Sequence, residues 1–276
     1  MQRPFSQVDV FSPEPFLGNP VAVVHDGDGL TTEQMQGFAS WTNLSETTFL
    51  LPPADPAADY LVRIFTPGAE LPFAGHPTLG TCHAWLTAGG APARPDEIVQ
   101  QCGAGLVRIR RTAGGLGFAA PPLVRSGPVD EHLVERAAAQ LGIARSDIVA
   151  AQWADNGPGW IALLLGSADA VLALRPGSVS MDIGVAGPCP PGSQCAFEVR
   201  AFFQIDGRSA EDPVTGSLNA SLAQWLLASG RASAPYVVSQ GTALGRRGRV
   251  HISRDHDGTI WVAGATVTRI GGSVEL

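Results

Sequence analysis

The chain has 276 residues, a length that fits either two domains of ordinary size or one large domain. Hydrophobic residues make up 45% of the sequence and charged residues only 16%, which indicates a globular protein and excludes a disordered polyelectrolyte. Because the formal net charge is −7 and the basic residues form no long run, we expect no nucleic acid partner.

All 18 cationic side chains are arginines, and the sequence contains no lysine. A pyridoxal-phosphate aldimine, a lysine Schiff base with a carbonyl substrate and a P-loop nucleotide site each require a lysine. Enzymes of these three classes are therefore excluded.

The four cysteines form no C-x-x-C pair and lack the spacing of a zinc site, so we expect no bound metal. The N-terminal residues alternate in polarity instead of forming the apolar segment of a signal peptide, and no run of about 18 apolar residues occurs. We therefore expect a reduced, cytoplasmic protein with no membrane contact.

The first half is predicted to contain strands followed by one strong helix. In the strand segments, β-branched and aromatic residues recur with a period of two, which is typical of half-buried strands. These segments are residues 8–11, 21–24, 47–51 and 60–65, with another at 107–111. The predicted helix, residues 77–88, has Pro77 in its first turn and is followed by Gly89 and Gly90, which favour termination.

A domain boundary is predicted near residues 121–128, where proline and glycine are frequent. A weaker amphipathic helix is expected at residues 130–141 and a strong one at residues 217–228. Both strong helices are apolar on nearly every side, as is normal for a buried helix. Further strands are predicted at residues 250–253 and 260–262. The pattern indicates two β-rich units, each wrapped around one central helix.

The two halves also resemble each other, which indicates an internal duplication. Four segments recur in the same order at offsets of 137 to 140 residues, the alternative being chance matches between common apolar patterns. The pairs are 18–24 with 156–162, 62–65 with 199–202, 84–90 with 224–230, and 99–101 with 238–240.

Polar clusters precede both central helices, at residues 70–78 and 211–217. A helix N-terminus offers unsatisfied N–H groups and the positive end of the helix dipole, so each cluster is suited to bind an anion. If the halves are related by pseudo-two-fold symmetry, the two helix ends can face each other across a cleft and bind a small carboxylate. The alternative is that Thr78 and Ser217 are ordinary caps and His76 a loop histidine.

A third segment, residues 43–50, places Glu46 at the start of an apolar strand, although by itself this is also an ordinary strand start. Five further residues can shape a pocket but are equally well explained as core or surface: Asp9, Trp41, Arg63, Asn156 and Trp160.

Together these segments resemble the phenazine-biosynthesis PhzF-like isomerase family, which shares its fold with diaminopimelate epimerase. The resemblance spans nearly the whole chain and rests on residues 18–23, 45–49, 73–80 and 211–217. It implies an α+β fold of two pseudo-symmetric domains, each a rolled, mostly antiparallel sheet around a central helix, with the active site between them.

The implied domains are residues 1–122 and 123–276, with a last strand at about 264–276 that can pack back on the first domain. The resemblance also suggests a homodimer. It places the acid/base glutamate at Glu46, the active-site histidine at His76 and the aspartate at Asp212. The residues predicted to bind substrate are Asn19, Gly75, Gly216 and Ser217.

The chain departs from the wider superfamily in its cysteines. Diaminopimelate epimerase and proline racemase look like the same fold with a cysteine at each helix N-terminus. Here Gly75 and Thr215 lie in those neighbourhoods and Cys82 lies about two turns into the first helix, so no thiol pair can act across a substrate. Racemisation by two bases is therefore disfavoured, and proton transfer by one carboxyl is favoured.

We therefore predict an isomerase without a cofactor, in which Glu46 moves a proton between carbons of a small, cyclic, carboxylated substrate. Apolar neighbours are expected to raise the pKa of Glu46 by desolvating its charged form, namely Phe49, Leu50 and Phe73. His76 and Asp212 would orient the substrate and stabilise developing charge. No G-x-G-x-x-G motif indicates a nicotinamide or flavin.

Two alternatives remain open: a non-catalytic protein that binds small carboxylates, and an epimerase or racemase of the same fold that uses acid/base groups other than cysteine. Binding alone would not need Glu46, His76 and Asp212 together. Serine hydrolysis is disfavoured because the sequence has no G-x-S-x-G motif.

Overall fold

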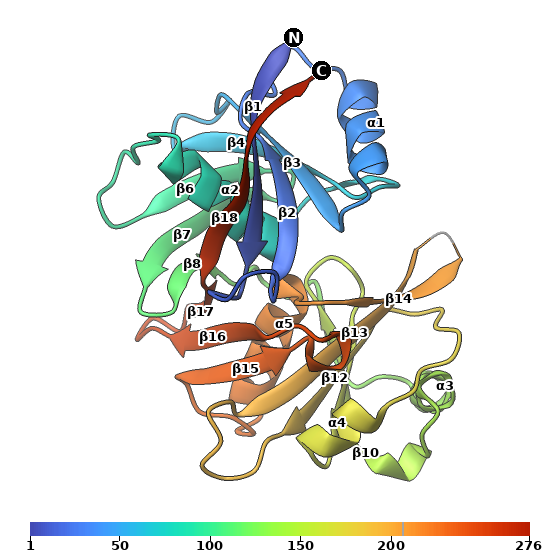
Figure 1. Ribbon diagram of the computed structural model, residues 1–276. Coiled ribbons are helices and arrows are strands. Elements are labelled where there is room, and N and C mark those ends of the chain that lie inside the picture. The colour runs from blue at the N-terminus through green and yellow to red at the C-terminus, as the bar shows by residue number, and fades with distance from the viewer. Residues whose placement is uncertain (206) are drawn as a thin grey trace. The chain divides into compact units, whose positions relative to one another are not determined.

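The computed structural model describes residues 1–205 and 207–276, and its contacts divide the chain into two compact units (Figure 1). Unit 1 comprises Met1–Ala119 and Ala263–Leu276, and unit 2 comprises Ala120–Val262. Each unit combines a mixed sheet with a few helices, so the predicted α+β class is confirmed. In the described residues, no helix is long and apolar enough to cross a membrane.

Unit 1 is built on a mostly antiparallel sheet. Its strands are β1 (Gln2–Val10), β2 (Asn19–Val24), β3 (Glu46–Leu51), β4 (Tyr60–Phe65), β5 (Glu70–Leu71), β6 (Ile98–Cys102), β7 (Gly105–Thr112), β8 (Gly115–Ala119) and β18 (Thr266–Glu275). Two neighbouring pairs are parallel, β2 with β3 and β4 with β6. The last strand, β18, lies antiparallel to β1 along its whole length, so the two termini lie side by side (Figure 1).

Two helices pack on opposite faces of this sheet. The central helix α2 (Gly75–Thr87) is surrounded by strands in Figure 1, and its Gly80 lies directly against Val10 and Val21. Helix α1 (Thr32–Thr42) covers the other face, where its Met35 packs with Phe49 and Phe65. The sheet of unit 1 is therefore covered by α2 on one face and by α1 on the other.

Unit 2 repeats this order of pairings. Its strands are β9 (Arg125–Gly127), β10 (Ile148–Asp155), β11 (Ile161–Leu165), β12 (Ile183–Pro188), β13 (Phe197–Ile205), β14 (Arg208–Asp212), β15 (Tyr236–Gln240) and β16 (Gly248–Arg254), and β17 (Ile260–Gly264) follows them. Its helices are α3 (Glu131–Leu141), α4 (Ala168–Ala173) and the central α5 (Gly216–Ala228), with short 3₁₀ turns at Arg145–Asp147 and Thr242–Leu244. As in unit 1, two pairs are parallel: β11 with β12, and β13 with β15, the strand that follows the central helix.

The predicted central helices are confirmed to within two residues, as is the amphipathic helix α3. The first strand ends one residue early, because Phe11 takes a left-handed conformation with φ of 69°. Helices α1 and α4 were not predicted. Helix α1 nevertheless begins with a capping box between Thr31 and Gln34, a pattern that is visible in the sequence.

Substituting Gly80 by alanine should destabilise unit 1. A Cβ at this position would lie 2.3 Å from Cγ1 of Val21, in a core that leaves little room to relax. We expect a loss of about 1–3 kcal/mol in the free energy of unfolding, measured by urea denaturation. Gly37 is the matched control, because it lies in α1 with open space where a Cβ would be. Its replacement by alanine should increase the free energy of unfolding by at most about 1 kcal/mol. Equal effects at both positions would contradict the close approach of α2 to the sheet.

Candidate active site

In unit 1 a carboxyl group and an imidazole meet at the start of the central helix. Glu46 is the first residue of β3, and His76 is the second residue of α2. Thr48, two residues along the strand from Glu46, accepts a hydrogen bond from Thr81 of α2 at 2.8 Å, so this face of β3 points to the helix. Oε2 of Glu46 lies 3.1 Å from Nε2 of His76.

The imidazole of His76 is buried and uncharged. Burial lowers its pKa to about 3, although a hydrogen bond with the backbone of Pro20 acts in the opposite direction. Nδ1 lies 3.3 Å from Nδ2 of Asn19, and these contacts hold the ring so that Nε2 faces Glu46. The contact between Glu46 and His76 is therefore one between a carboxyl group and a neutral imidazole, not an ion pair.

His76 should consequently remain neutral throughout the physiological range. We expect its ring resonances, followed by NMR in protein labelled with ¹⁵N-histidine, to show no titration between about pH 5 and 9. The exposed His132 provides a reference signal in the same spectra. A midpoint for His76 above pH 6 would show that its imidazole is not desolvated.

The expected apolar environment of Glu46 is only partly correct. Phe49 points to the opposite face of β3, because an odd separation along a strand reverses the side chain, and it packs against α1. Leu50 shares the face of Glu46, and Phe73 packs against Phe118 with ring centroids 5.5 Å apart. The prediction that Phe49 desolvates Glu46 is therefore wrong.

In unit 2 the start of the central helix holds the second group of predicted residues. Helix α5 begins at Gly216, and the residue before it, Thr215, donates a hydrogen bond from Oγ1 to Oδ2 of Asp212 at 2.6 Å. Gln240 fixes this turn by accepting from the backbone N–H of Thr215 and donating to its Oγ1. Asp212, Gly216 and Ser217 thus form one cluster.

Neither central helix has a side-chain N-cap. The hydroxyl of Thr78 donates to the carbonyl of Ala74, and that of Ser217 accepts from Nε1 of Trp160 at 3.3 Å. Thr78 and Ser217 are therefore not ordinary caps, and the N-terminal N–H groups of both helices keep the anion-binding character that the sequence suggests.

The five additional pocket candidates lie in different environments. Asn156 and Trp160 both bond Ser217, since Nδ2 of Asn156 donates to its carbonyl at 2.9 Å. Arg63 pairs with Glu70 at a partly exposed position, and Trp41 is 81% exposed on α1. Asp9 is buried in β1. Asn156 and Trp160 therefore contact a residue of the candidate site.

The first central helix carries a cysteine that is unsuited to catalysis. Cys82 is fully buried, and burial raises its pKa to about 12, so its thiolate is not populated near neutral pH. This agrees with proton transfer by groups other than thiols. Within residues 1–205 and 207–276, no cluster of three or more His, Cys, Asp and Glu side chains could hold a metal ion.

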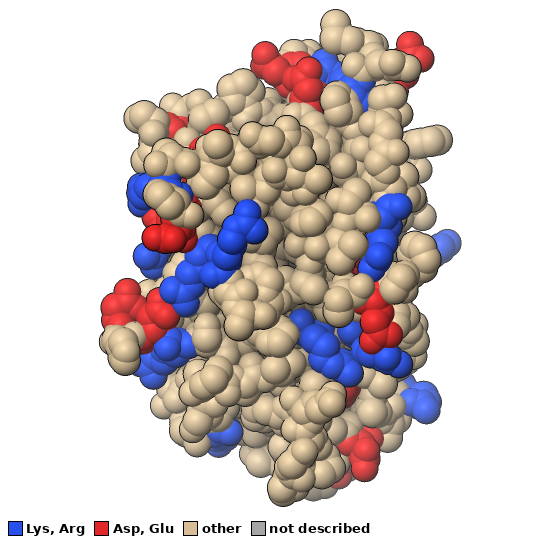
Figure 2. All heavy atoms as spheres, turned by 60° about the vertical axis from the view of Figure 1, so that its left-hand side comes forward, with Lys and Arg blue, Asp and Glu red and all other residues tan. Residues whose placement is uncertain are grey.

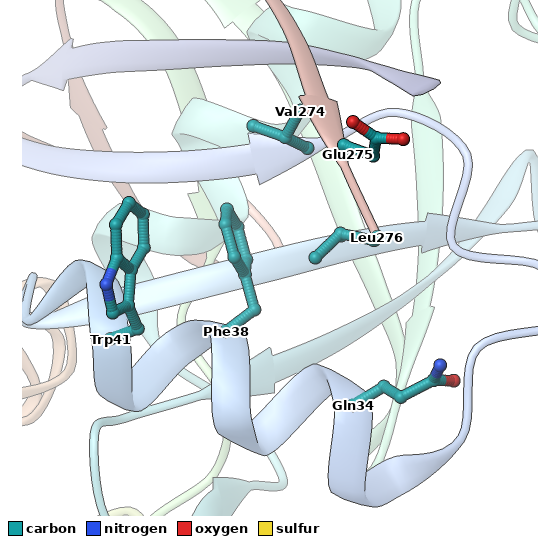
Figure 3. Close-up of a pocket in the computed structure, with 6 residues that line it drawn as sticks. All are labelled: Gln34, Phe38, Trp41, Val274, Glu275 and Leu276. Carbon is teal, nitrogen blue, oxygen red and sulfur yellow. The ribbon is translucent and has the colours of Figure 1, made fainter. Parts of the chain in front are cut away.

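A separate surface cavity of about 470 Å³ lies between α1 and the C-terminal end of β18 (Figure 3). Its lining is mostly apolar and comprises Gln34, Phe38, Trp41, Val274, Glu275 and Leu276. Phe38 packs against Phe49, which points away from Glu46, so the cavity lies on the opposite face of β3 from the candidate site. On the face shown in Figure 2, charged side chains form small groups with wide uncharged areas between them, as the low charged fraction of the sequence suggests.

Comparisons with known proteins show the family of the chain. Residues 8–272 match the PhzC-PhzF family, described as phenazine biosynthesis-like protein. The chain is 36% identical to "Antisense-enhancing sequence 1" of Schizosaccharomyces pombe, over 98% of each chain. It is 35% identical to the trans-2,3-dihydro-3-hydroxyanthranilate isomerase of Pseudomonas aeruginosa, over 88% of this chain and 87% of the relative.

Solved structures show the same fold. A phenazine biosynthesis protein of the PhzF family from Bacillus anthracis superposes with a TM-score of 0.83 at 22% identity, with complete coverage of both chains. A hydroxyproline epimerase from Agrobacterium vitis superposes with a TM-score of 0.59 at 13% identity, over 99% of this chain and 92% of that one.

Proposed function

We propose a cofactor-independent proton transfer for this chain, which belongs to the phenazine biosynthesis-like (PhzC-PhzF) family of isomerases. It has the diaminopimelate epimerase-like fold, which the PhzF proteins share with the related epimerases. The observation that carries the proposal is the contact of Glu46 with the neutral, buried His76 at the N-terminus of α2.

In the reaction we propose, a single carboxyl group carries the proton from one carbon to the other. Glu46 removes a proton from one carbon of the substrate, holds it as the carboxylic acid and returns it to a different carbon of the same molecule. Because the carboxylate is restored at the end, the step needs no oxidant, reductant or co-reactant. General acid–base catalysis of this kind typically contributes about 10²–10⁴-fold in rate.

His76 and Asn19 are proposed to position both Glu46 and the substrate. In the described part of the chain, Nε2 of His76 makes no aligned hydrogen bond, although Glu46 is nearby, so it can bind a substrate hydroxyl or amine. A neutral ring serves this purpose better than a charged one, which would pair with the Glu46 carboxylate and weaken it as a base.

The groups at the start of α5 in unit 2 are suited to bind a carboxylate and an amine. The N–H groups at Gly216 and Ser217 lie at the positive end of α5 and suit a carboxylate, while Asp212 suits an amine. The substrate would then be a small cyclic amino acid, such as the trans-2,3-dihydro-3-hydroxyanthranilate named for the Pseudomonas aeruginosa relative. A homodimer, as the resemblance suggests, stays part of the proposal.

The test is turnover of trans-2,3-dihydro-3-hydroxyanthranilate, followed by NMR together with a panel of related cyclic amino-carboxylates. We expect at least one compound to lose a C–H proton and gain one at another carbon. In D₂O, a product that has gained deuterium at one stereocentre and has the opposite configuration there would indicate an epimerase instead. Binding of these compounds without any change to them would indicate a non-catalytic carboxylate-binding protein.

A further inference from the structure

We propose that Asp182 is a second acid–base residue of this isomerase, occupying in unit 2 the place that Glu46 occupies in unit 1. The inference rests on the function proposed above and deepens it. Nothing in the sequence motifs points to Asp182, because it lies outside all the segments that carry the family resemblance.

The strand register makes the two carboxyl groups equivalent. In unit 1, Thr47 of β3 pairs with Phe65 of β4, and in unit 2, Ile183 of β12 pairs with Phe202 of β13. Phe65 and Phe202 end the matching V-R-x-F segments of the two units. Thr47 therefore corresponds to Ile183, and the residue before each is an acid, Glu46 in one unit and Asp182 in the other.

On its other side, each strand has a parallel neighbour in both units. Val21 of β2 lies opposite Glu46 in a parallel pair, and Ile161 lies opposite Ile183, which places Trp160 opposite Asp182. The backbone N–H of Ile161 donates to the carbonyl of Asp182 at 2.9 Å, so the ladder continues to this residue.

Asp182 also shares its face of the sheet with α5. Ile183 points the other way, into the core formed with α3 and α4. Gly184, two residues along from Asp182, lies against α5 so closely that a Cβ there would be 2.2 Å from Cδ1 of Leu218. Alternation along the strand therefore directs Asp182 to the helix side, just as it directs Glu46.

The helix ends complete the correspondence. Both central helices have 13 residues, and their second residues are His76 and Ser217. Each is contacted by an asparagine: Asn19, the first residue of β2, contacts His76, and Asn156, between β10 and β11, donates to the carbonyl of Ser217. The set of Glu46, His76 and Asn19 in unit 1 thus corresponds to Asp182, Ser217 and Asn156 in unit 2.

One buried polar atom at this place points to a ligand. The side chain of Asn156 is held by its Nδ2, but its Oδ1 is buried and has no hydrogen-bond partner among the described residues. Asn156 is 8% exposed, and a buried acceptor left unsatisfied in this way costs free energy unless something donates to it. A substrate amine or hydroxyl would supply the missing donor.

The electrostatics suit Asp182 for proton exchange. Burial, and then the nearby charge of Asp155, raise the pKa of Asp182 to about 6. Asp212 lies on the same face of the sheet, two strands away through the pairs of Ala201 with Gly184 and with Asp212. All three groups are acidic, so a bound carboxylate would raise the pKa of Asp182 further and favour its protonated form.

The proposed step balances within the substrate. As the C–H proton passes to a base, the Asp182 carboxylic acid breaks its O–H bond and protonates the nitrogen or oxygen conjugated with that carbon. The electron pair of the broken C–H bond moves into the conjugated system. When the base returns the first proton to the second carbon, the heteroatom returns its own proton to Asp182, and no other reactant is needed.

The kinetic test compares Asp182→Asn and Asp182→Glu with wild type. We expect the asparagine variant to lower kcat by about 100-fold with KM changed less than about 3-fold, because the amide can donate a hydrogen bond but cannot transfer a proton. In wild type we expect kcat/KM to decline above about pH 6, where Asp182 loses its proton. This decline should be absent from the asparagine variant, and Asp182→Glu should retain part of kcat. Asp169→Asn, an exposed position on α4, is the matched control and should behave as wild type.

The binding test uses NMR of protein labelled with ¹³C at the aspartate carboxyls, with Asp182 assigned by its absence in Asp182→Asn. Anthranilate is the probe, since it carries the ring, amine and carboxylate but cannot rearrange. We expect bound anthranilate to raise the titration midpoint of the Asp182 carboxyl group above about 6. A midpoint that anthranilate leaves unchanged while it binds would overturn the proposal.

The outcomes separate this inference from the function on which it rests. If Asp182→Asn keeps full kcat and the wild-type pH profile while Glu46→Gln loses turnover, the role of Asp182 is overturned but the proposed function is not. Absence of turnover in wild type overturns the proposed function, and the NMR titration then decides whether Asp182 faces the ligand.

Discussion

Replacing Glu46 by glutamine is expected to lower kcat by about 10⁴-fold, the upper end of what a general acid–base group contributes. The amide has nearly the shape of the carboxyl and can keep the 3.1 Å contact with Nε2 of His76. It cannot accept a proton from carbon, however, so substrate binding should change little while the chemical step is lost. Single-turnover kinetics with trans-2,3-dihydro-3-hydroxyanthranilate measure this directly.

Glu33→Gln is the matched control for this experiment. Glu33 lies in the first turn of α1 and is exposed, on the opposite side of the sheet from the candidate site. It should retain full activity. If Glu46→Gln also retains full turnover, another group must move the proton, and Glu46 is not the acid–base residue.

The second large effect concerns stability. Arg200→Met is expected to lower the free energy of unfolding by about 3–5 kcal/mol, because it leaves the carboxylate of Glu211 buried without its partner. The guanidinium bonds both carboxylate oxygens, at 2.8 and 2.7 Å, and also donates to the carbonyls of Val171 and Leu174 at the end of α4. Urea denaturation followed by circular dichroism measures the loss.

Unit 1 contains the same pair in a more exposed setting, which provides a control within the chain. Arg63 bonds both oxygens of Glu70, but the two side chains are 25% and 39% exposed, against 5% and 12% for Arg200 and Glu211. Exposed ion pairs contribute about 0–1 kcal/mol, so Arg63→Met should have a small effect. Similar losses in both variants would show that burial does not decide the contribution of this pair.

Local sequence signals predicted much of the fold. Both central helices are apolar on nearly every side, and their glycine stops, Gly89 and Gly230, take φ of 96° and 68° as the signal requires. Helix α1 was missed because its apolar residues are few, although Thr31 and Gln34 carry the capping signal. Propensity and periodicity are strongest where burial is complete, and α1 is largely exposed.

The candidate site was harder to predict. The approach of Glu46 to His76 depends on how β3 and α2 pack, and the sequence places these residues together only through the family resemblance. The neutral state of His76 follows from desolvation, which cannot be calculated without the surrounding atoms. Phe49 could have been placed correctly, since an odd separation from Glu46 already puts it on the other face.

Asp182 could not be found from motifs. The matching segments of the two halves lie 137 to 140 residues apart, whereas Glu46 and Asp182 are separated by 136, and their flanking residues differ. Only the hydrogen-bonding register of β12 with β13 and β11 makes them equivalent. A functional group that a duplicated fold places by register therefore needs a structure to be recognised.

The most direct test of proton transfer by one carboxyl is a single turnover, in ordinary water, of substrate that carries deuterium at the C–H bond that breaks. Transfer by Glu46 predicts that part of this deuterium appears at the carbon that gains the proton, because the same carboxyl group takes and returns it. Product that has lost all of its deuterium to the solvent at the earliest times would contradict transfer by one carboxyl.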